Sequence, residues 1–154
     1  MDLSTFKVSD WLIICGGAVF LFFAFVDWFR FDDLGGPNGF DFSLTGLVPW
    51  LLMVGAGVVT FAIAGGFLRP AGMPWPLVVL LATGLATLLV LLRTLIGFDV
   101  EGVDYDRAAG LWVCLLCTFV STAGAVLAFQ ADGGHLRDLT DKDKLGDAFR
   151  RRKP

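Results

Sequence analysis

Four apolar stretches dominate this chain of 154 residues and restrict it to very few folds. They run from Trp11 to Val26, from about Leu44 to Leu68, from Trp75 to about Phe98, and from Ala108 to Ala131. A helix needs about 20 apolar residues to cross the hydrocarbon of a membrane, and the last three stretches are long enough. The first reaches that length only if Asp10 and Asp27 lie at the two membrane surfaces. Lipid cannot satisfy open strand edges, and barrel-type alternation is absent, so we expect helices.

The composition agrees with a membrane protein. Hydrophobic residues make up 56% of the chain and charged residues 18%, whereas about 25% charge is usual in a soluble domain. This argues against a disordered chain and against nucleic acid as a partner. We therefore predict an all-α membrane protein, a four-transmembrane-helix bundle with spans at about 11–29, 45–68, 75–98 and 108–131. These spans form a domain of residues 1–131, and a charged tail follows at 132–154.

The distribution of Lys and Arg predicts the orientation of the bundle. One side carries Lys7, Arg69, Arg137, Lys142, Lys144, Arg150, Arg151, Arg152 and Lys153. The other side carries only Arg30 and Arg107, with Arg93 near that surface. The positive-inside rule places the richer side in the cytoplasm, so both termini are expected there and two loops face outward. A cleaved signal peptide is the alternative for the first stretch, but Asp27-Trp28-Phe29 is not a small-residue cleavage site.

The two outer loops share a short pattern. Glycine, an apolar residue, aspartate and an aromatic residue follow one another at 39–42 and again at 102–105. Each copy is followed by a Gly-Leu pair, at Gly46 and at Gly110, and then by tryptophan. The pattern is compatible with the hypothesis of two tandem helical hairpins related by an axis along the membrane normal. Chance recurrence in a chain rich in Gly, Phe and Leu is the alternative.

Arg93 is the only charged residue deep within an apolar stretch, which makes it the first candidate site. Counted from Trp75 at about 1.5 Å per residue, it lies roughly 27 Å along its helix, near the outer surface. Asp27, Asp99 and Asp106 are candidate partners, and Asp27 is favoured because it also borders the hydrocarbon. A structural ion pair that locks the third helix to the first or fourth, and a role toward a substrate or ion, both fit this position.

The outer loops offer further candidates. Asp32, Asp33, Asn38 and Asp41 surround a tight turn, and they fit either a divalent cation or a solvated anionic surface. The aromatic residues among them fit either a cap on the helix ends or a surface for a partner. These aromatic residues are Phe29, Phe31, Phe40 and Phe42.

Other motifs give little support for chemistry. Cys114 and Cys117 share one helix face, but inside lipid they are expected to be apolar filler rather than a redox pair. The chain has one histidine and no catalytic motif, so we expect no cofactor, no metal and no enzymatic activity. The basic cluster at the end of the tail fits an attraction to anionic lipid, worth about 1 kcal/mol per charge, or a simple topology anchor. Its members are Arg150, Arg151, Arg152 and Lys153.

The segments Ala24–Trp28, Leu91–Arg93 and Ala109–Trp112 carry a family resemblance. In these positions the chain resembles the small four-span integral membrane proteins of unknown function that are common in actinobacteria, and the likeness covers most of residues 10–131. The resemblance implies a bacterial plasma membrane and no known activity.

Few polar groups lie in the predicted spans, so there is little material for a transport path. We therefore expect an accessory or scaffolding subunit of a membrane complex, with the lipid bilayer and other membrane proteins as partners. The first alternative is a small transporter or channel formed by oligomerisation, with a wet path beside a set of polar side chains. That set is Thr60, Thr87, Arg93, Thr94 and Ser121. The second alternative is an enzyme acting on lipid at the outer face, which would need several outer carboxylates to converge.

Overall fold

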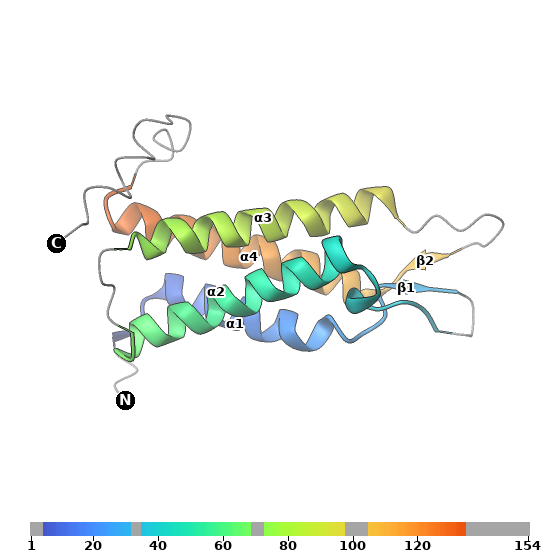
Figure 1. Cartoon of the computed structure of the whole chain (residues 1–154), viewed down its shortest axis with the longest axis horizontal. Helices are drawn as coiled ribbons and strands as arrows, with labels where there is room; N and C mark the ends of the chain where they lie inside the picture. The colour runs from blue at the N-terminus through green and yellow to red at the C-terminus, as the bar shows by residue number, and fades with distance from the viewer. Residues whose placement is uncertain (1–4, 32–34, 69–72, 98–104, 135–154) are drawn as a thin grey trace.

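The computed structural model describes residues 5–31, 35–68, 73–97 and 105–134. Its four helices are α1 (Val8–Phe23), α2 (Val48–Ala64), α3 (Trp75–Ile96) and α4 (Ala109–Ala131). Figure 1 shows them as one elongated bundle in which successive helices run in opposite directions. α1 packs against α2 and α4, and α3 packs against the same two helices, so α1 and α3 occupy opposite corners. The predicted all-α bundle of four helices is confirmed.

Three of the described helical stretches are long and apolar enough to cross a membrane. They are Ser43–Ala64, Trp75–Ile96 and Ala109–Ala131, with 22, 22 and 23 residues. Their mean hydropathies are 2.2, 2.3 and 2.1. α1 is apolar but has 16 residues, which is about 24 Å of helix against about 30 Å of hydrocarbon. These lengths and hydropathies are those of a multi-pass integral membrane protein.

The outer surface of the bundle is apolar along its length. Large hydrophobic side chains stand exposed on all four helices, with Leu88 at 60% and Leu116 at 64% exposure. A soluble protein of this size rarely exposes such a continuous apolar surface, whereas lipid would cover it. Further members are Phe22, Leu51, Val58, Leu81, Leu95 and Phe119.

The first helix differs from the predicted span 11–29, because it begins at Val8 and ends at Phe23. The backbone after it bonds to the following loop instead of continuing the helix. The N–H of Trp28 donates to the carbonyl of Pro37 at 2.9 Å, and the carbonyl of Ala24 accepts from the N–H of Gly39 at 2.9 Å. In a continued helix these two groups would have bonded to each other. The loop therefore ends α1 by taking its hydrogen-bonding groups.

The other helices end close to their predicted positions, with glycine as the reason. α2 ends at Ala64 instead of residue 68, since Gly66 adopts a φ of +76° that terminates the helix. α3 ends at Ile96 instead of residue 98, and Gly97 follows with a φ of +74°. α2 is preceded by a π-helical turn, η3 (Ser43–Leu47), so its α-helical part starts three residues after the predicted residue 45. α4 agrees with the predicted span to within one residue.

The two loops at one end of the bundle pair with each other, which the sequence did not predict. β1 (Phe29–Arg30) follows α1, and β2 (Asp106–Arg107) precedes α4; the two strands are antiparallel. A short 3₁₀ turn, η2 (Gly39–Asp41), lies between β1 and η3. We call this end of the bundle the loop end; it contains β1, β2, η2 and η3 (Figure 1). We call the opposite end, where α1 begins and α4 ends, the termini end.

Most of the buried hydroxyl groups in the bundle bond to backbone carbonyls. Thr83, Thr87 and Thr94 on α3 donate to the carbonyl four residues earlier, at 3.0, 2.9 and 2.8 Å. Thr118 donates to Leu115 at 2.7 Å. Two further bonds link helices: Ser121 donates to the Leu12 carbonyl at 3.4 Å, and the Thr87 and Thr122 hydroxyls lie 2.9 Å apart. The hydrogen-bonding capacity of these hydroxyl groups is therefore satisfied by other groups of the protein.

The two glycines of the repeated loop pattern have the same structural role. A β-carbon on Gly46 would collide with the carbonyl of Gly39, and one on Gly110 would collide with the carbonyls of Val26 and Asp27. Each glycine thus lets loop backbone approach the start of a helix. The secondary structure around them differs, since Gly46 lies in a π turn and Gly110 in α4. Residues 102–104 lie outside the described part, so the tandem-hairpin hypothesis stays a prediction.

Candidate functional site

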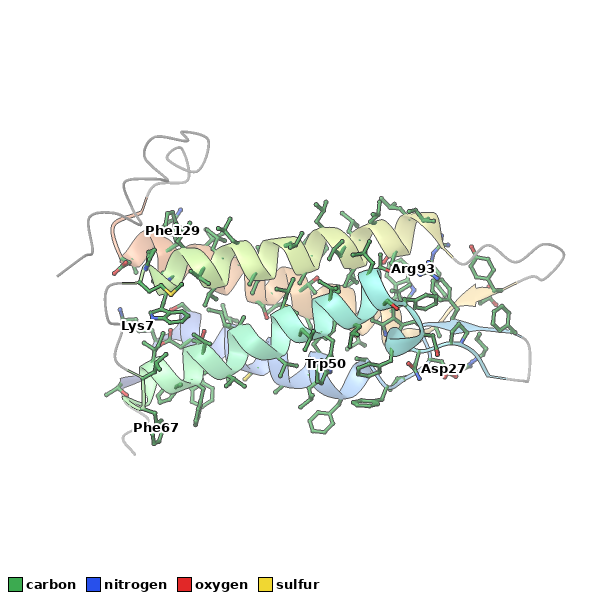
Figure 2. The ribbon with its side chains drawn as sticks, in the orientation of Figure 1. Lys7, Asp27, Trp50, Phe67, Arg93 and Phe129 are labelled. Atoms are coloured by element: carbon green, nitrogen blue, oxygen red, sulfur yellow. The ribbon has the colours of Figure 1, made fainter. Side chains whose placement is uncertain are left out.

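Arg93 lies on the last turn of α3 and contacts the aromatic side chains of the loop end. Its guanidinium carbon is 3.5 Å from the ring centroid of Phe42 and 5.2 Å from that of Phe29. Figure 2 shows the side chain at the loop end, directed toward the chain segment between α1 and α2. A guanidinium over two aromatic faces is a cation–π arrangement, which is strongest where water is excluded. Arg93 therefore ties α3 to the first loop.

The rings that hold Arg93 belong to an aromatic cap, which we define as Trp28, Phe29, Phe42 and Tyr105. Phe29 is fully buried and packs edge-on against Phe42 at 5.6 Å and against Tyr105 at 5.5 Å, centroid to centroid. Trp28, also fully buried, stacks on Phe42 at 6.3 Å. Of the two roles left open for the loop aromatics, Phe29 and Phe42 take that of a cap over the helix ends.

The structure describes two of the three predicted acidic partners of Arg93, Asp27 and Asp106. The backbone of Asp27 forms an antiparallel bridge with Asn38, directly after α1. Asp106 is exposed on β2, opposite Arg30 of β1. Asp99 lies outside the described residues, as do Asp32 and Asp33. An ion pair between Arg93 and one of these aspartates stays a prediction.

Arg107 has a structural role that the sequence analysis missed. Its Nε donates to the carbonyl of Thr94 at 2.9 Å, in the last turn of α3. A cation at a helix C-terminus satisfies a free carbonyl and complements the helix dipole. The two residues are thirteen positions apart, in separate elements, so helix periodicity gave no signal for this contact.

We expect Arg107→Met to destabilise the loop end by about 1 kcal/mol, the usual cost of one lost hydrogen bond. Chemical unfolding of the purified protein in detergent measures the change. Arg30→Met is the matched control, because Arg30 is also exposed on the small sheet and has no described contact with a helix end. Equal losses in the two variants would contradict the capping role.

The Asp41 carboxylate holds the backbone of the first loop in shape. Asp41 accepts the N–H of Asn38 at 2.8 Å through Oδ2, and the Asn38 side chain accepts the N–H of Phe40 at 2.8 Å. This reciprocal arrangement caps η2. Within the described ranges, no three His, Cys, Asp or Glu side chains come together as a metal site.

Cys114 and Cys117 lie in the core between α4 and its neighbours, and both are free thiols. The buried indole N–H of Trp28 lies beside the sulfur of Cys114, a weak acceptor. Cys15 is exposed on α1. The basic cluster Arg150–Lys153 lies outside the described residues.

Comparisons of the chain with known protein families, with curated proteins and with solved structures find no match.

Proposed function

We propose that this protein is a non-enzymatic accessory or scaffolding subunit of a membrane complex, with the loop end as its contact surface. The observation that carries the proposal is the construction of this end. Backbone pairing of β1 with β2, the aromatic cap and the Arg93 contacts join the described parts of the two loops to each other and to α3. A fixed surface loses little conformational entropy when a partner binds.

Charged side chains are exposed on the surface of the loop end. Arg30, Asp41, Asp106 and Arg107 are exposed around the buried aromatic cap. Such a mixed polar rim favours a specific protein partner over lipid, since rim charges set register and partner choice.

The interior gives little support to a transport path through one chain. Four of the five residues expected beside such a path are buried, and Thr87, Thr94 and Ser121 already donate to protein oxygens. Arg93 faces the aromatic cap. The Asp41 carboxylate likewise accepts a backbone N–H of its own loop, which favours a binding role over lipid chemistry.

Photo-cross-linking in the native membrane tests this proposal. A photoreactive phenylalanine analogue at position 106, exposed on β2 at the loop end, is expected to give a discrete protein adduct. The same analogue at position 88 is the control, because Leu88 is exposed on the lateral apolar face. Recovery of lipid adducts alone from positions 30 and 106 would overturn the proposed contact surface.

We further propose that the termini end faces the cytoplasm of a bacterial plasma membrane, as the Lys and Arg distribution favours. In a variant with its three cysteines replaced by alanine, Asp106→Cys at the exposed β2 position is expected to react with a membrane-impermeant maleimide on intact cells. Lys7→Cys at the termini end should react only after permeabilisation. The reverse labelling pattern would contradict the orientation while leaving the bundle unaffected.

A further inference from the structure

A cavity of about 340 Å³ opens between all four helices at the termini end. It lies at the start of α1 and α3 and at the end of α2 and α4. Ile13 and Val79 form its inner apolar wall, and Trp75 and Pro76 flank it on α3. The volume falls within the range of about 300–1,000 Å³ that is usual for small-molecule sites. The cavity is at the opposite end of the bundle from the aromatic cap and is independent of the proposed contact surface.

Two hydroxyl groups on largely buried residues open onto this cavity without a hydrogen bond to a described residue. Ser9 and Thr60 line it and are 5% and 8% exposed. Every other buried serine or threonine in the described ranges uses its hydroxyl in a hydrogen bond to another described residue. Each of these two hydroxyl groups can donate one hydrogen bond into the cavity. A ligand that accepts two hydrogen bonds there would use both donors.

Charges of both signs surround the cavity. Lys7, Asp10 and Asp132 line it together with the two hydroxyls. The Asp10 carboxylate accepts the backbone N–H of Lys7 at 2.9 Å through Oδ2, and a carboxylate has about four acceptor positions in all. Figure 2 shows Lys7 at the termini end, far from Arg93. The site thus offers an ammonium and two hydroxyl donors for an anion, and carboxylate oxygens for a cation.

We propose that this cavity binds the headgroup of a zwitterionic phospholipid with a primary amine, of the phosphatidylethanolamine type. The phosphate accepts hydrogen bonds from Lys7, Ser9 and Thr60. The primary ammonium donates to the Asp10 carboxylate. A membrane lipid, and not a soluble molecule, is favoured as the source of this headgroup for two reasons. Trp75 lies at the interfacial end of a membrane-length helix, and Val8, next to Lys7, is 74% exposed. The acyl chains then leave the cavity along the lateral apolar surface.

Native mass spectrometry of the full chain in detergent tests the site. The purified protein is incubated with dioleoyl phosphatidylethanolamine, phosphatidylglycerol and phosphatidylcholine at equal concentration. We expect one phosphatidylethanolamine per chain to be retained in preference to the other two lipids. The double variant Ser9→Ala with Thr60→Val should bind it about tenfold more weakly, since two hydrogen bonds are lost.

The matched control is Thr94→Val with Thr118→Val, which removes two buried hydroxyls that bond within their own helices. It should keep the lipid. Lys7→Gln, at an exposed position, provides a variant whose folding is not at risk, and it should lower the retained fraction several-fold. The proposal would be overturned if the protein retained the three lipids equally or if Lys7→Gln left the amount of bound phosphatidylethanolamine unchanged. It would also be overturned if the control variant lost as much bound lipid as the Ser9→Ala, Thr60→Val variant. Tight binding of soluble O-phosphoethanolamine alone would overturn the lipid as the source.

Discussion

Trp28→Ala is expected to destabilise the protein by about 3–5 kcal/mol, the range for removing a large buried aromatic side chain. Trp28 is fully buried between α1 and the loop end. It packs edge-on against Phe20 at 6.5 Å and stacks on Phe42 at 6.3 Å. Phe42 in turn lies under the guanidinium of Arg93. Loss of the indole therefore leaves a cavity beneath the residues that join α3 to the first loop.

Unfolding by sodium dodecyl sulfate in mixed micelles, followed by circular dichroism, measures this change. Trp112→Ala is the matched control, because Trp112 is 52% exposed on the lateral surface of α4. Removal of the Trp112 indole should lower the free energy of unfolding much less, since detergent or lipid replaces the contacts of that side chain. Similar losses for the two tryptophans would show that the aromatic cap does not hold the loop end together.

Gly17→Ala is expected to cost about 1–3 kcal/mol, the range for overpacking a close contact. A β-carbon at this position would lie 2.8 Å from the carbonyl oxygen of Met53 on α2. Backbone cannot rotate away as a side chain can, so α1 and α2 must separate. Small residues that allow close backbone approach are the main source of helix packing in lipid.

The control for this variant is Gly55→Ala on α2. No atom lies within 4 Å of a β-carbon at Gly55. The change should therefore be neutral or stabilising by up to about 1 kcal/mol, since alanine is the better helix former. The same unfolding assay distinguishes the two glycines, and a loss at Gly55 as large as that at Gly17 would contradict the steric argument.

The long helices could be predicted because each is fixed by local properties of the chain. Apolar length defines α3 and α4, and Gly97 ends α3 where its backbone turns to positive φ. The early end of α1 could not be predicted, because it depends on Pro37 and Gly39 bonding back to the helix end from a later loop. The β1–β2 pairing depends on residues nearly eighty positions apart, which no periodicity reveals.

The candidate site was predictable only in part. Arg93 stands out as a charge in an apolar stretch, and the aromatic residues near it were visible as an unusual cluster. That Phe42 and Phe29 would contact the guanidinium follows from the folding of the first loop over α3. Thr60 stood out only as one of the polar residues beside the alternative transport path, and Ser9 gave no signal, since a hydroxyl in a helix usually bonds to its own backbone. In the folded bundle both residues line the cavity at the termini end.

The backbone contacts between the two loops have a consequence for the order in which the chain can fold during synthesis. The N–H of Ala108 donates to the carbonyl of Trp28 at 2.9 Å, and Gly110 admits the backbone of Val26 and Asp27 beside the start of α4. The beginning of the chain thus acquires its final contacts only when the last hairpin has emerged from the ribosome. A nascent chain arrested before residue 105 would lack β2 and α4, and Phe29 would lack the ring of Tyr105 that packs against it.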